Sequence, residues 1–417
     1  MKRFFLKSLL VLFGLMVGLL IAEIALRIIG YSAPYFYMTD RYRGVALRPG
    51  VEGWYQREGK QYIRINSEGL RDREHSKVKP ENRLRIAVIG DSYAEAFQVP
   101  PESAFWAVME KRLQECGAFG GREVEVINFG VSGYGTAQEL ITLRRQVWDY
   151  SPDIVLLAVT TNNDITDNSR ALKRSDIPYF VYRDGQLTLD DSFQNSRTFR
   201  LRSSAVNNVL NWIRNRSRVI QAIDEASRAI KIYMTRERAP ASSPPANGQS
   251  QEAVSTPQSP SNQRTPPFEE VGIDNMIYRE PADAVWEDAW RVTEGLIKLM
   301  NDEVRSKGAK FLVVTLSNGI QVYPDPQARQ DFMRRVGSND LFYPDLRIKN
   351  FCEHEGIPVL TLAPQLQAYA EEHNVFLHGF DATLGSGHWN PLGHRVAGEM
   401  IAQRLCENSV TAVTAYQ

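Results

Sequence analysis

The sequence predicts an α/β protein with a doubly wound, five-stranded parallel sheet between two layers of helices. Five short apolar runs rich in β-branched residues alternate with longer segments of helical periodicity, the pattern of a parallel sheet covered on both faces. A hydrophobic segment opens the chain, and one long polar interruption separates the third and fourth strand runs. We therefore expect a single α/β domain with an N-terminal anchor and an insertion.

The composition favours a globular domain with no overall bias towards nucleic acid. The 417 residues contain 49 Lys and Arg and 49 Asp and Glu, so the formal net charge is zero, whereas nucleic-acid-binding domains are usually basic. The three cysteines, Cys116, Cys352 and Cys406, lie far apart and form neither a CxxC pair nor the dense pattern of a disulfide framework. We expect them to be small core residues.

The first thirty residues predict a transmembrane anchor. A basic start precedes the uncharged run SLLVLFGLMVGLLIA at 8–22, and apolar character continues to Ile29. About 20 apolar residues cross a bilayer, and no small-x-small cleavage site follows the run cleanly. We expect an uncleaved anchor at 1–30, with the N-terminus in the cytoplasm and the remainder outside it, in the periplasm or the extracellular space. A cleaved signal peptide and a buried core helix are the alternatives.

Residues 31–83 predict a hairpin-like segment that leads into the main domain at 84–410. The strand runs of that domain are LRIAVIG, EVEVINF, DIVLLAV, KFLVVTL and IPVLTL, at 84–90, 123–129, 153–159, 310–316 and 357–362. Segments between them, such as 283–308, have the apolar spacing of helices. In a sheet of this kind, ligands bind beyond the carboxyl ends of the strands.

An insertion at 166–282 interrupts the domain between its third and fourth strands. It includes a helical arm at 199–234 and a tract at 236–268 that is rich in Pro, Ser, Gln and Asn. Such a tract cannot bury enough apolar area to fold, and we expect it to be a disordered linker. The insertion could serve as a lid or as a docking surface, and the sequence leaves both open.

Polar and glycine-rich segments follow the first three strands. GDSYAEAF places Ser92 on a tight turn, where it either exposes its hydroxyl or merely caps the next segment. NFGVSGYGTAQE includes Gly133, and backbone N–H groups at such a turn suit a developing negative charge. TTNNDITD places Asn163 at the corresponding rim. Because the carboxyl ends of parallel strands share one edge of the sheet, we expect these residues to meet there.

Two histidines lie in GSGHWNPLGH, near the end of the chain. Asn390 and Pro391 predict the start of a helix. His394 falls inside that helix and is expected to face the sheet, where burial disfavours the imidazolium that a general base must become. His388 precedes the helix in a loop and is the candidate base. Trp389 beside it could stack on a sugar ring or pack as a hydrophobic staple.

These four blocks, in this order, resemble the SGNH hydrolase superfamily, also called GDSL esterases and lipases. The serine of the family's GDS motif, its glycine, its asparagine and its C-terminal histidine match Ser92, Gly133, Asn163 and His388, over about 84–165 and 283–405. The resemblance implies a flavodoxin-like, three-layer α/β/α fold and acyl-ester chemistry that requires no cofactor and no metal. Ser92 would attack the acyl carbonyl, and His388 would take and return its proton. The backbone N–H groups of Ser92 and Gly133, with the Asn163 amide, would form the oxyanion hole.

Two positions depart from the family pattern. Asn162 stands where the family often has glycine, and Gly385, followed by Ser386, stands where it usually has the aspartate that orients the histidine. The nearest acidic residue upstream is Asp381, which is the candidate acid. Otherwise Ser386 or a backbone carbonyl orients His388, and the enzyme works as a Ser–His dyad.

The leading hypothesis is a membrane-anchored serine esterase that cleaves an acyl ester, such as an O-acetyl ester, outside the cytoplasm. Its substrate would be an acyl ester, with a carbohydrate among the candidates. One alternative is an O-acyltransferase that acts on an envelope polysaccharide with the same residues. Another is a non-catalytic, envelope-associated binding module that has lost its acid.

Overall fold

The structure is a computed structural model that describes residues 2–117, 119–238 and 275–414. Two compact units divide the chain. One is Met1–Pro34 with Leu210–Pro266, and the other is Tyr35–Val209 with Pro267–Gln417. The second unit contains all of the strands that the structure assigns in the described residues.

The larger unit is built on a five-stranded parallel sheet. Its strands are β5 (Arg83–Gly90), β6 (Glu123–Asn128), β7 (Ile154–Val159), β10 (Lys310–Thr315) and β11 (Val359–Thr361). They lie in the order β11-β10-β7-β5-β6, and every pair is parallel. Numbered along the chain, this is the order 2-1-3-4-5 of a doubly wound, flavodoxin-like sheet. The predicted strands and fold class are confirmed.

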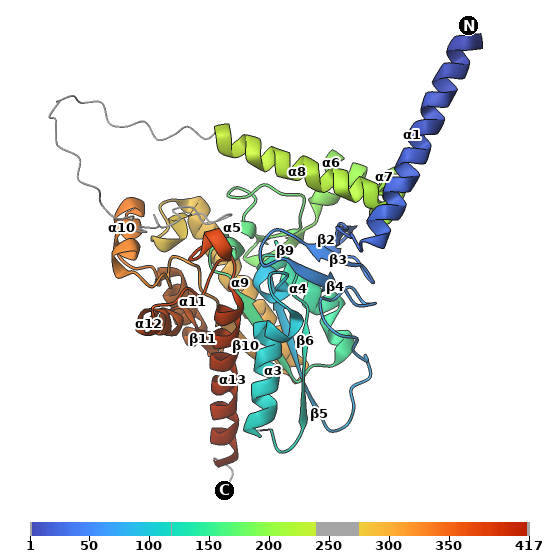
Figure 1. Cartoon of the computed structure of the whole chain (residues 1–417). Helices are drawn as coiled ribbons and strands as arrows, with labels where there is room; N and C mark the ends of the chain where they lie inside the picture. Colours follow the sequence, from blue (N-terminus) through green and yellow to red (C-terminus); the bar gives the residue numbers. More distant parts are fainter. Residues whose placement is uncertain (1, 118, 239–274, 415–417) are drawn as a thin grey trace, which may run out of the picture. The chain divides into compact units, whose positions relative to one another are not determined.

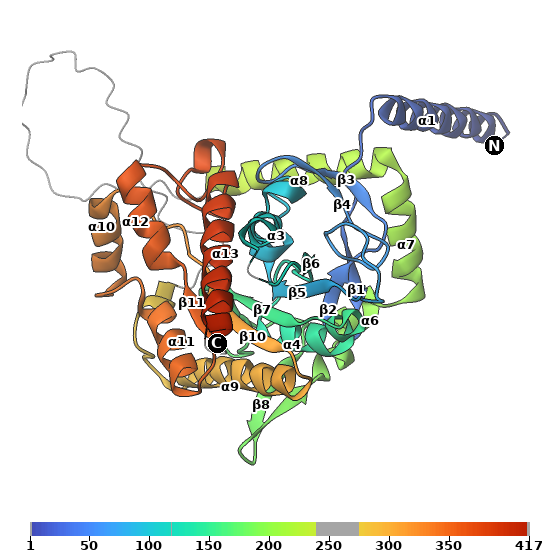
Figure 2. The same ribbon diagram turned by 90° about the horizontal axis from the view of Figure 1, so that it is seen from below.

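Helices cover both faces of the sheet (Figures 1 and 2). One layer contains α4 (Thr136–Arg145), α9 (Ala284–Ser306), α10 (Pro326–Val336) and α11 (Tyr343–His354), and the other contains α3 (Phe105–Cys116), α12 (Ala363–His373) and α13 (Pro391–Thr414). Strand side chains alternate between the two cores: Ala87 and Ile89 belong to the first, and Ile86 and Val88 to the second. Burial on both faces explains why the strands read as continuous apolar runs.

Two β-hairpins precede the sheet, where the sequence predicted one hairpin-like segment. They are β1 (Tyr37–Asp40) with β2 (Gly44–Leu47), and β3 (Glu52–Tyr55) with β4 (Gln61–Arg64). A small apolar core joins them to the carboxyl-end loops of the sheet: Phe36 and Ile63 from the hairpin segment pack with Phe97, Val131 and Tyr134. The hairpins therefore form a wall of the rim where ligands are expected.

The insertion begins as part of the larger unit. After α5 (Asn163–Asp167), the hairpin β8 (Tyr179–Arg183) and β9 (Gln186–Asp190) places Phe180 in the core. The arm predicted at 199–234 is helical in three pieces, α6 (Arg197–Arg202), α7 (Ala205–Arg216) and α8 (Arg218–Arg238). The predicted disordered linker at 236–268 lies outside the described residues, apart from 236–238, where α8 ends.

The smaller unit contains α1 (Lys2–Ile28) and α8. The stretch Arg3–Ile28 has a mean hydropathy of 2.7, and the residues of its most apolar part are not buried against the rest of the protein. Its length and composition would let it cross a membrane. Glu23, near its end, accepts hydrogen bonds from the Val219 amide (3.0 Å) and the Ser217 hydroxyl (3.1 Å). The end of α1 is thus hydrogen-bonded to the turn between α7 and α8.

A disulfide bond links Cys116 to Cys406, which corrects the expectation that all three cysteines are reduced core residues. The bond joins α3 to α13, whose Cα atoms at these positions lie 6.5 Å apart. The two residues are 290 positions apart in sequence, and only the packing of α3 on α13 brings them together. Cys352 is a buried free thiol, as predicted.

We expect the Cys116–Cys406 disulfide to stabilise the larger unit, because it closes a very long loop in the unfolded chain. Replacing both cysteines with serine should lower the free energy of unfolding by about 2–4 kcal/mol, measured by denaturant titration. Reductant should destabilise the parent protein and leave the double variant unchanged. Three titratable thiols in denatured, unreduced protein would contradict the bond.

Candidate active site

Ser92 lies just beyond the carboxyl end of strand β5, as the sequence predicted. It is the first residue of the single-turn helix α2 (Ser92–Glu95), and the Asp91 side chain caps this turn by accepting the Tyr93 amide N–H (3.0 Å). The turn ends at once because Ala96 adopts a left-handed conformation (φ 54°). This sharp bend leaves the Ser92 hydroxyl at the rim rather than inside a long helix.

His388 joins the Ser92 hydroxyl to a carboxylate. Its Nε2 atom lies 2.9 Å from Ser92 Oγ, and its Nδ1 atom lies 2.5 Å from Glu58 Oε2. These contacts fit the tautomer in which Nδ1–H donates to Glu58 while Nε2 accepts the serine hydroxyl. A hydroxyl, an imidazole and an orienting carboxylate in this order form the arrangement that activates a serine as a nucleophile.

The acid at His388 is Glu58, and not Asp381 as the sequence suggested. Asp381 is exposed in a short 3₁₀ turn (Asp381–Thr383) at a positive φ of 48°. An aspartate at position 385, the family's usual place, would not fit. Gly385 has φ +91°, and a Cβ atom there would lie 2.4 Å from the Tyr323 ring. The dyad alternative is also corrected, because a carboxylate does reach Nδ1.

Glu58 reaches the histidine from the turn between β3 and β4, and two glycines make the approach possible. A Cβ atom on Gly59 (φ +69°) would lie 1.8 Å from the Gln98 carbonyl oxygen, and one on Gly387 would lie 2.4 Å from Glu58 Oε1. Sequence reasoning missed Glu58 because it lies 330 residues from His388. Gly59 in the turn was the one local signal, and it indicates a bend rather than a partner.

A buried hydrogen-bond chain fixes the loop that carries His388. Trp389 donates its indole N–H to Ser317 Oγ (2.9 Å), Ser317 lies 3.0 Å from His378 Nε2, and His378 Nδ1 lies 2.8 Å from the Gly387 carbonyl oxygen. The contacts are satisfied together when Ser317 donates to Nε2 and Nδ1–H donates to Gly387. Burial lowers the pKa of His378 to about 3, so this ring is neutral. Ser317 and His378 are residues that sequence reasoning missed.

His394 has the structural role that its sequence position predicted. It is fully buried, accepts the Phe105 amide N–H at Nδ1 (3.2 Å) and stacks on the Phe105 ring. Burial lowers its pKa to about 3. The predicted cap is confirmed, since Asn390 Oδ1 accepts the Leu392 amide (3.0 Å). Trp389 is fully buried and is therefore no platform for a sugar ring.

The residues predicted to hold an oxyanion line one cavity with the Ser92–His388 pair. Gly133 and Asn163 both border this cavity, which has a volume of about 200 Å³. The Asn163 amide donates one N–H to Asp91 Oδ2 (3.0 Å), which fixes its orientation. The preceding residue, Ser132, donates its backbone N–H to Glu95 Oε1 (3.1 Å) and so anchors the glycine loop. The structure thus brings all four predicted residues together.

Several carboxyl groups are buried behind this cavity. Burial raises the pKa of Asp91, despite hydrogen bonds from Tyr93, Asn163 and Thr160. Burial, strengthened by repulsion from neighbouring carboxylates such as Asp91, raises the pKa values of Glu139 and Asp164 well above the usual range. A raised pKa favours the neutral carboxyl, which opposes an oxyanion at Asn163 less than a carboxylate does. Among the described residues, no group of three or more His, Cys, Asp or Glu side chains could hold a metal ion.

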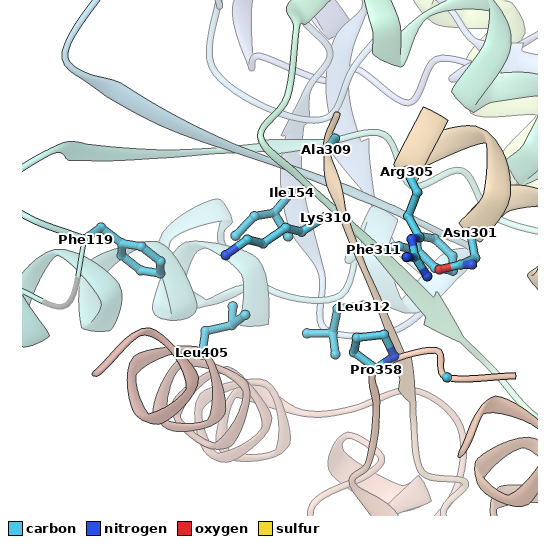
Figure 3. Close-up of a pocket in the computed structure, with 11 residues that line it drawn as sticks. Phe119, Ile154, Asn301, Arg305, Ala309, Lys310, Phe311, Leu312, Pro358 and Leu405 are labelled. Atoms are coloured by element: carbon cyan, nitrogen blue, oxygen red, sulfur yellow. The ribbon is translucent and has the colours of Figure 1, made fainter. Parts of the chain in front are cut away.

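A second cavity, of about 420 Å³, lies at the opposite end of the sheet. Ile154 and Lys310, the first residues of β7 and β10, line it together with Arg305 from α9 and Leu405 from α13. Figure 3 shows these side chains around it, with Phe119 at one side. It lies away from the carboxyl ends of the strands and holds no serine or histidine, so it is not the candidate active site.

The sheet order and the site residues agree with the resemblance that the sequence motifs carry. The chain resembles the SGNH hydrolases in its sheet order and in the order of its site residues. No protein-family model and no curated protein matches the chain.

Similar solved structures include two esterases and one protein of a lipolytic family. They are the acetyl xylan esterase AlAXEase (13% identity, 77% of this chain and 99% of that chain covered, TM-score 0.36), the acetylxylan esterase Axe2 from Geobacillus stearothermophilus (9%, 78% and 94%, 0.35) and a protein assigned to the lipolytic G-D-S-L family from Desulfitobacterium hafniense DCB-2 (11%, 76% and 98%, 0.33). The superpositions are loose, so the likeness to the SGNH hydrolases rests on the sheet order and the site residues of this chain.

We expect Glu95, which anchors the glycine loop, to make stability depend on pH. Burial raises its pKa from 4.5 to about 7, so its folded form binds the proton more tightly than its unfolded form. The ionisation of Glu95 therefore lowers the free energy of unfolding as the pH rises from about 4.5 through 7. Glu95→Gln keeps an acceptor for Ser132 and a partner for the Tyr37 hydroxyl.

The Glu95→Gln variant should match the parent near pH 4.5 and exceed its free energy of unfolding by about 3 kcal/mol near pH 8. Denaturant titrations at the two pH values measure this difference. A variant less stable than the parent at both values would contradict the assignment.

Proposed function

We propose that the protein is a serine esterase that cleaves an acyl ester through Ser92, His388 and Glu58. The observation that carries the proposal is the unbroken series of contacts from Glu58 to His388 to Ser92. Serine is a weak nucleophile until a base removes its proton, and a carboxylate on the second ring nitrogen stabilises the imidazolium that results. A binding module that had lost its acid would not need this carboxylate.

In the first half-reaction, Ser92 Oγ attacks the acyl carbonyl carbon while its proton passes to His388 Nε2. The backbone N–H groups of Ser92 and Gly133 donate to the tetrahedral oxyanion. Asn163 contributes the amide hydrogen that Asp91 does not hold. Each such donor lowers the activation barrier by about 3 kcal/mol. As the ester C–O bond breaks, His388 donates its proton to the departing alkoxide, and the acyl group remains on Ser92.

In the second half-reaction, a water molecule attacks the acyl-enzyme and gives its proton to His388. The tetrahedral intermediate collapses, the carboxylic acid leaves, and His388 returns the proton to Ser92. The cavity of about 200 Å³ favours a short acyl group, and we propose an O-acetyl ester as the substrate class. The esterase is the proposed function. The alternative is an O-acyltransferase, in which a sugar hydroxyl replaces water as the acceptor.

We further propose that the larger unit, which contains Ser92 and His388, works outside the cytoplasm and that α1 anchors the protein in the membrane. α1 has the length and hydropathy of a span, and a basic start precedes it. The Cys116–Cys406 disulfide supports the same location, because disulfides persist in oxidising compartments such as the periplasm or the cell exterior.

We expect a serine-reactive fluorophosphonate to label Ser92 and p-nitrophenyl acetate to be hydrolysed. Ser92→Ala should abolish both, because no other hydroxyl contacts Nε2 of His388 in the described structure. Ser386→Ala is the matched control and should retain both, since the ring nitrogens of His388 contact Glu58 and Ser92 rather than Ser386. Labelling that persists in Ser92→Ala would exclude Ser92 as the nucleophile.

We expect Glu58→Gln to lower kcat for ester hydrolysis by a factor on the order of 10² to 10⁴, because the imidazolium loses its counter-charge. Asp381→Asn, the matched control, should leave kcat unchanged, since Asp381 is exposed in a surface turn. Steady-state kinetics over a pH series would measure both. Full activity in Glu58→Gln together with a loss of activity in Asp381→Asn would show that Asp381, and not Glu58, is the acid that orients His388.

A further inference from the structure

Helix α7 carries an exposed apolar stripe. Leu210, Trp212 and Ile213 are 58%, 57% and 41% exposed. Leu210 and Ile213 continue the spacing of Val206 and Val209 in the preceding turns, which places these four side chains on one face of the helix. Asn208 and Asn211 lie on the other side of the helix. A soluble protein rarely exposes a contiguous apolar surface without a partner for it.

Helix α8 continues this pattern. Ile223 and Ile230 are 57% and 59% exposed and lie seven residues apart, on one face of the helix. At the end of α7, the Arg216 guanidinium lies over the Trp212 ring, 4.3 Å from its centroid. Tryptophan and arginine beside an apolar stripe are typical of helices that lie in the interface of a lipid bilayer.

The turn between α7 and α8 is hydrogen-bonded to the end of α1, which belongs to the same compact unit. Arg27 donates to the Arg216 carbonyl oxygen (2.6 Å), and Glu23 accepts the Val219 amide (3.0 Å). Just beyond α1, Arg218 donates to the Ser32 hydroxyl (2.6 Å). The two stripes therefore begin where the apolar helix ends.

The direction of the helices agrees with this location. Within the unit, α8 runs across the direction of α1 rather than along it (Figure 1). A helix that crosses a bilayer runs near the membrane normal, so a helix set across its end lies near the membrane plane.

We propose that α7 and α8 are interfacial helices whose apolar stripes insert into the outer headgroup region of the bilayer that α1 spans. The inference rests on the proposed membrane anchor and adds a second attachment to the same membrane. The occupant of the stripes is lipid, because they adjoin the end of the span and carry the tryptophan and arginine pattern of the interface. The helical arm of the insertion thus serves as a membrane-docking surface and not as a lid.

Depth-dependent quenching in the full-length protein tests this. Single cysteines are introduced by Leu210→Cys and Ile213→Cys on the stripe, by Asn208→Cys on the polar side as the matched control, and by Leu12→Cys inside α1. The native disulfide stays oxidised and Cys352 stays buried, so an environment-sensitive fluorophore labels the new thiols. The labelled chains are reconstituted into vesicles of phosphatidylcholine and phosphatidylglycerol that contain brominated acyl chains.

We expect the fluorophores at positions 12, 210 and 213 to be quenched by brominated lipid about twofold or more relative to position 208. Quenching at 12 with none at 210 and 213 would overturn the interfacial helices and leave the anchor standing. Protection of 210 and 213 from aqueous iodide without lipid quenching would assign the stripe to a protein partner and overturn the proposal. No quenching at 12 would overturn the anchor and, with it, this inference. Ester hydrolysis, measured in the same samples, reports separately on the proposed activity.

Discussion

The contact between Glu58 and His388 is the constraint on which the rest of the site depends. It joins a hairpin near the start of the larger unit to a loop near the end of the chain. The hairpin is held in place by an apolar core of its own, in which Ile63 packs with Phe97 beside α2. Gly59 and Gly387 leave the space that the carboxylate needs. The segment before the sheet therefore supplies a residue of the proposed active site.

The other side of the His388 loop is fixed by neutral hydrogen bonds. The Trp389–Ser317–His378–Gly387 chain is buried and fully paired, so it holds the loop without placing a second charge near the imidazole. The raised pKa values of Glu139 and Asp164 likewise favour neutral carboxyls near Asn163, which we propose as an oxyanion donor. The hydrogen-bonded contact of the Glu58 carboxylate with Nδ1 of His388 is the one that the proposed chemistry uses.

The sequence predicts the parts of this architecture that are local. Each strand run is a short apolar segment bounded by turn residues, and Ser92, Gly133 and Asn163 each follow a strand directly, so their common edge could be predicted. Asn390 and Pro391 likewise separate the roles of His388 and His394. Glu58 and the Cys116–Cys406 disulfide could not be predicted, because their partners lie 330 and 290 residues away. Periodicity and motif spacing carry no information about such pairings in a single chain.

The most direct measurement of the Glu58–His388 contact is ¹⁵N and ¹H NMR of the histidine-labelled protein. The contact of Nδ1 with Glu58 predicts a proton on Nδ1 and a strongly downfield, exchange-protected Nδ1–H resonance, because that proton is donated to a carboxylate. The account predicts that this resonance is present in the parent protein and disappears in Glu58→Ala. A resonance that survives in Glu58→Ala, or a His388 that carries its proton on Nε2, would contradict the account.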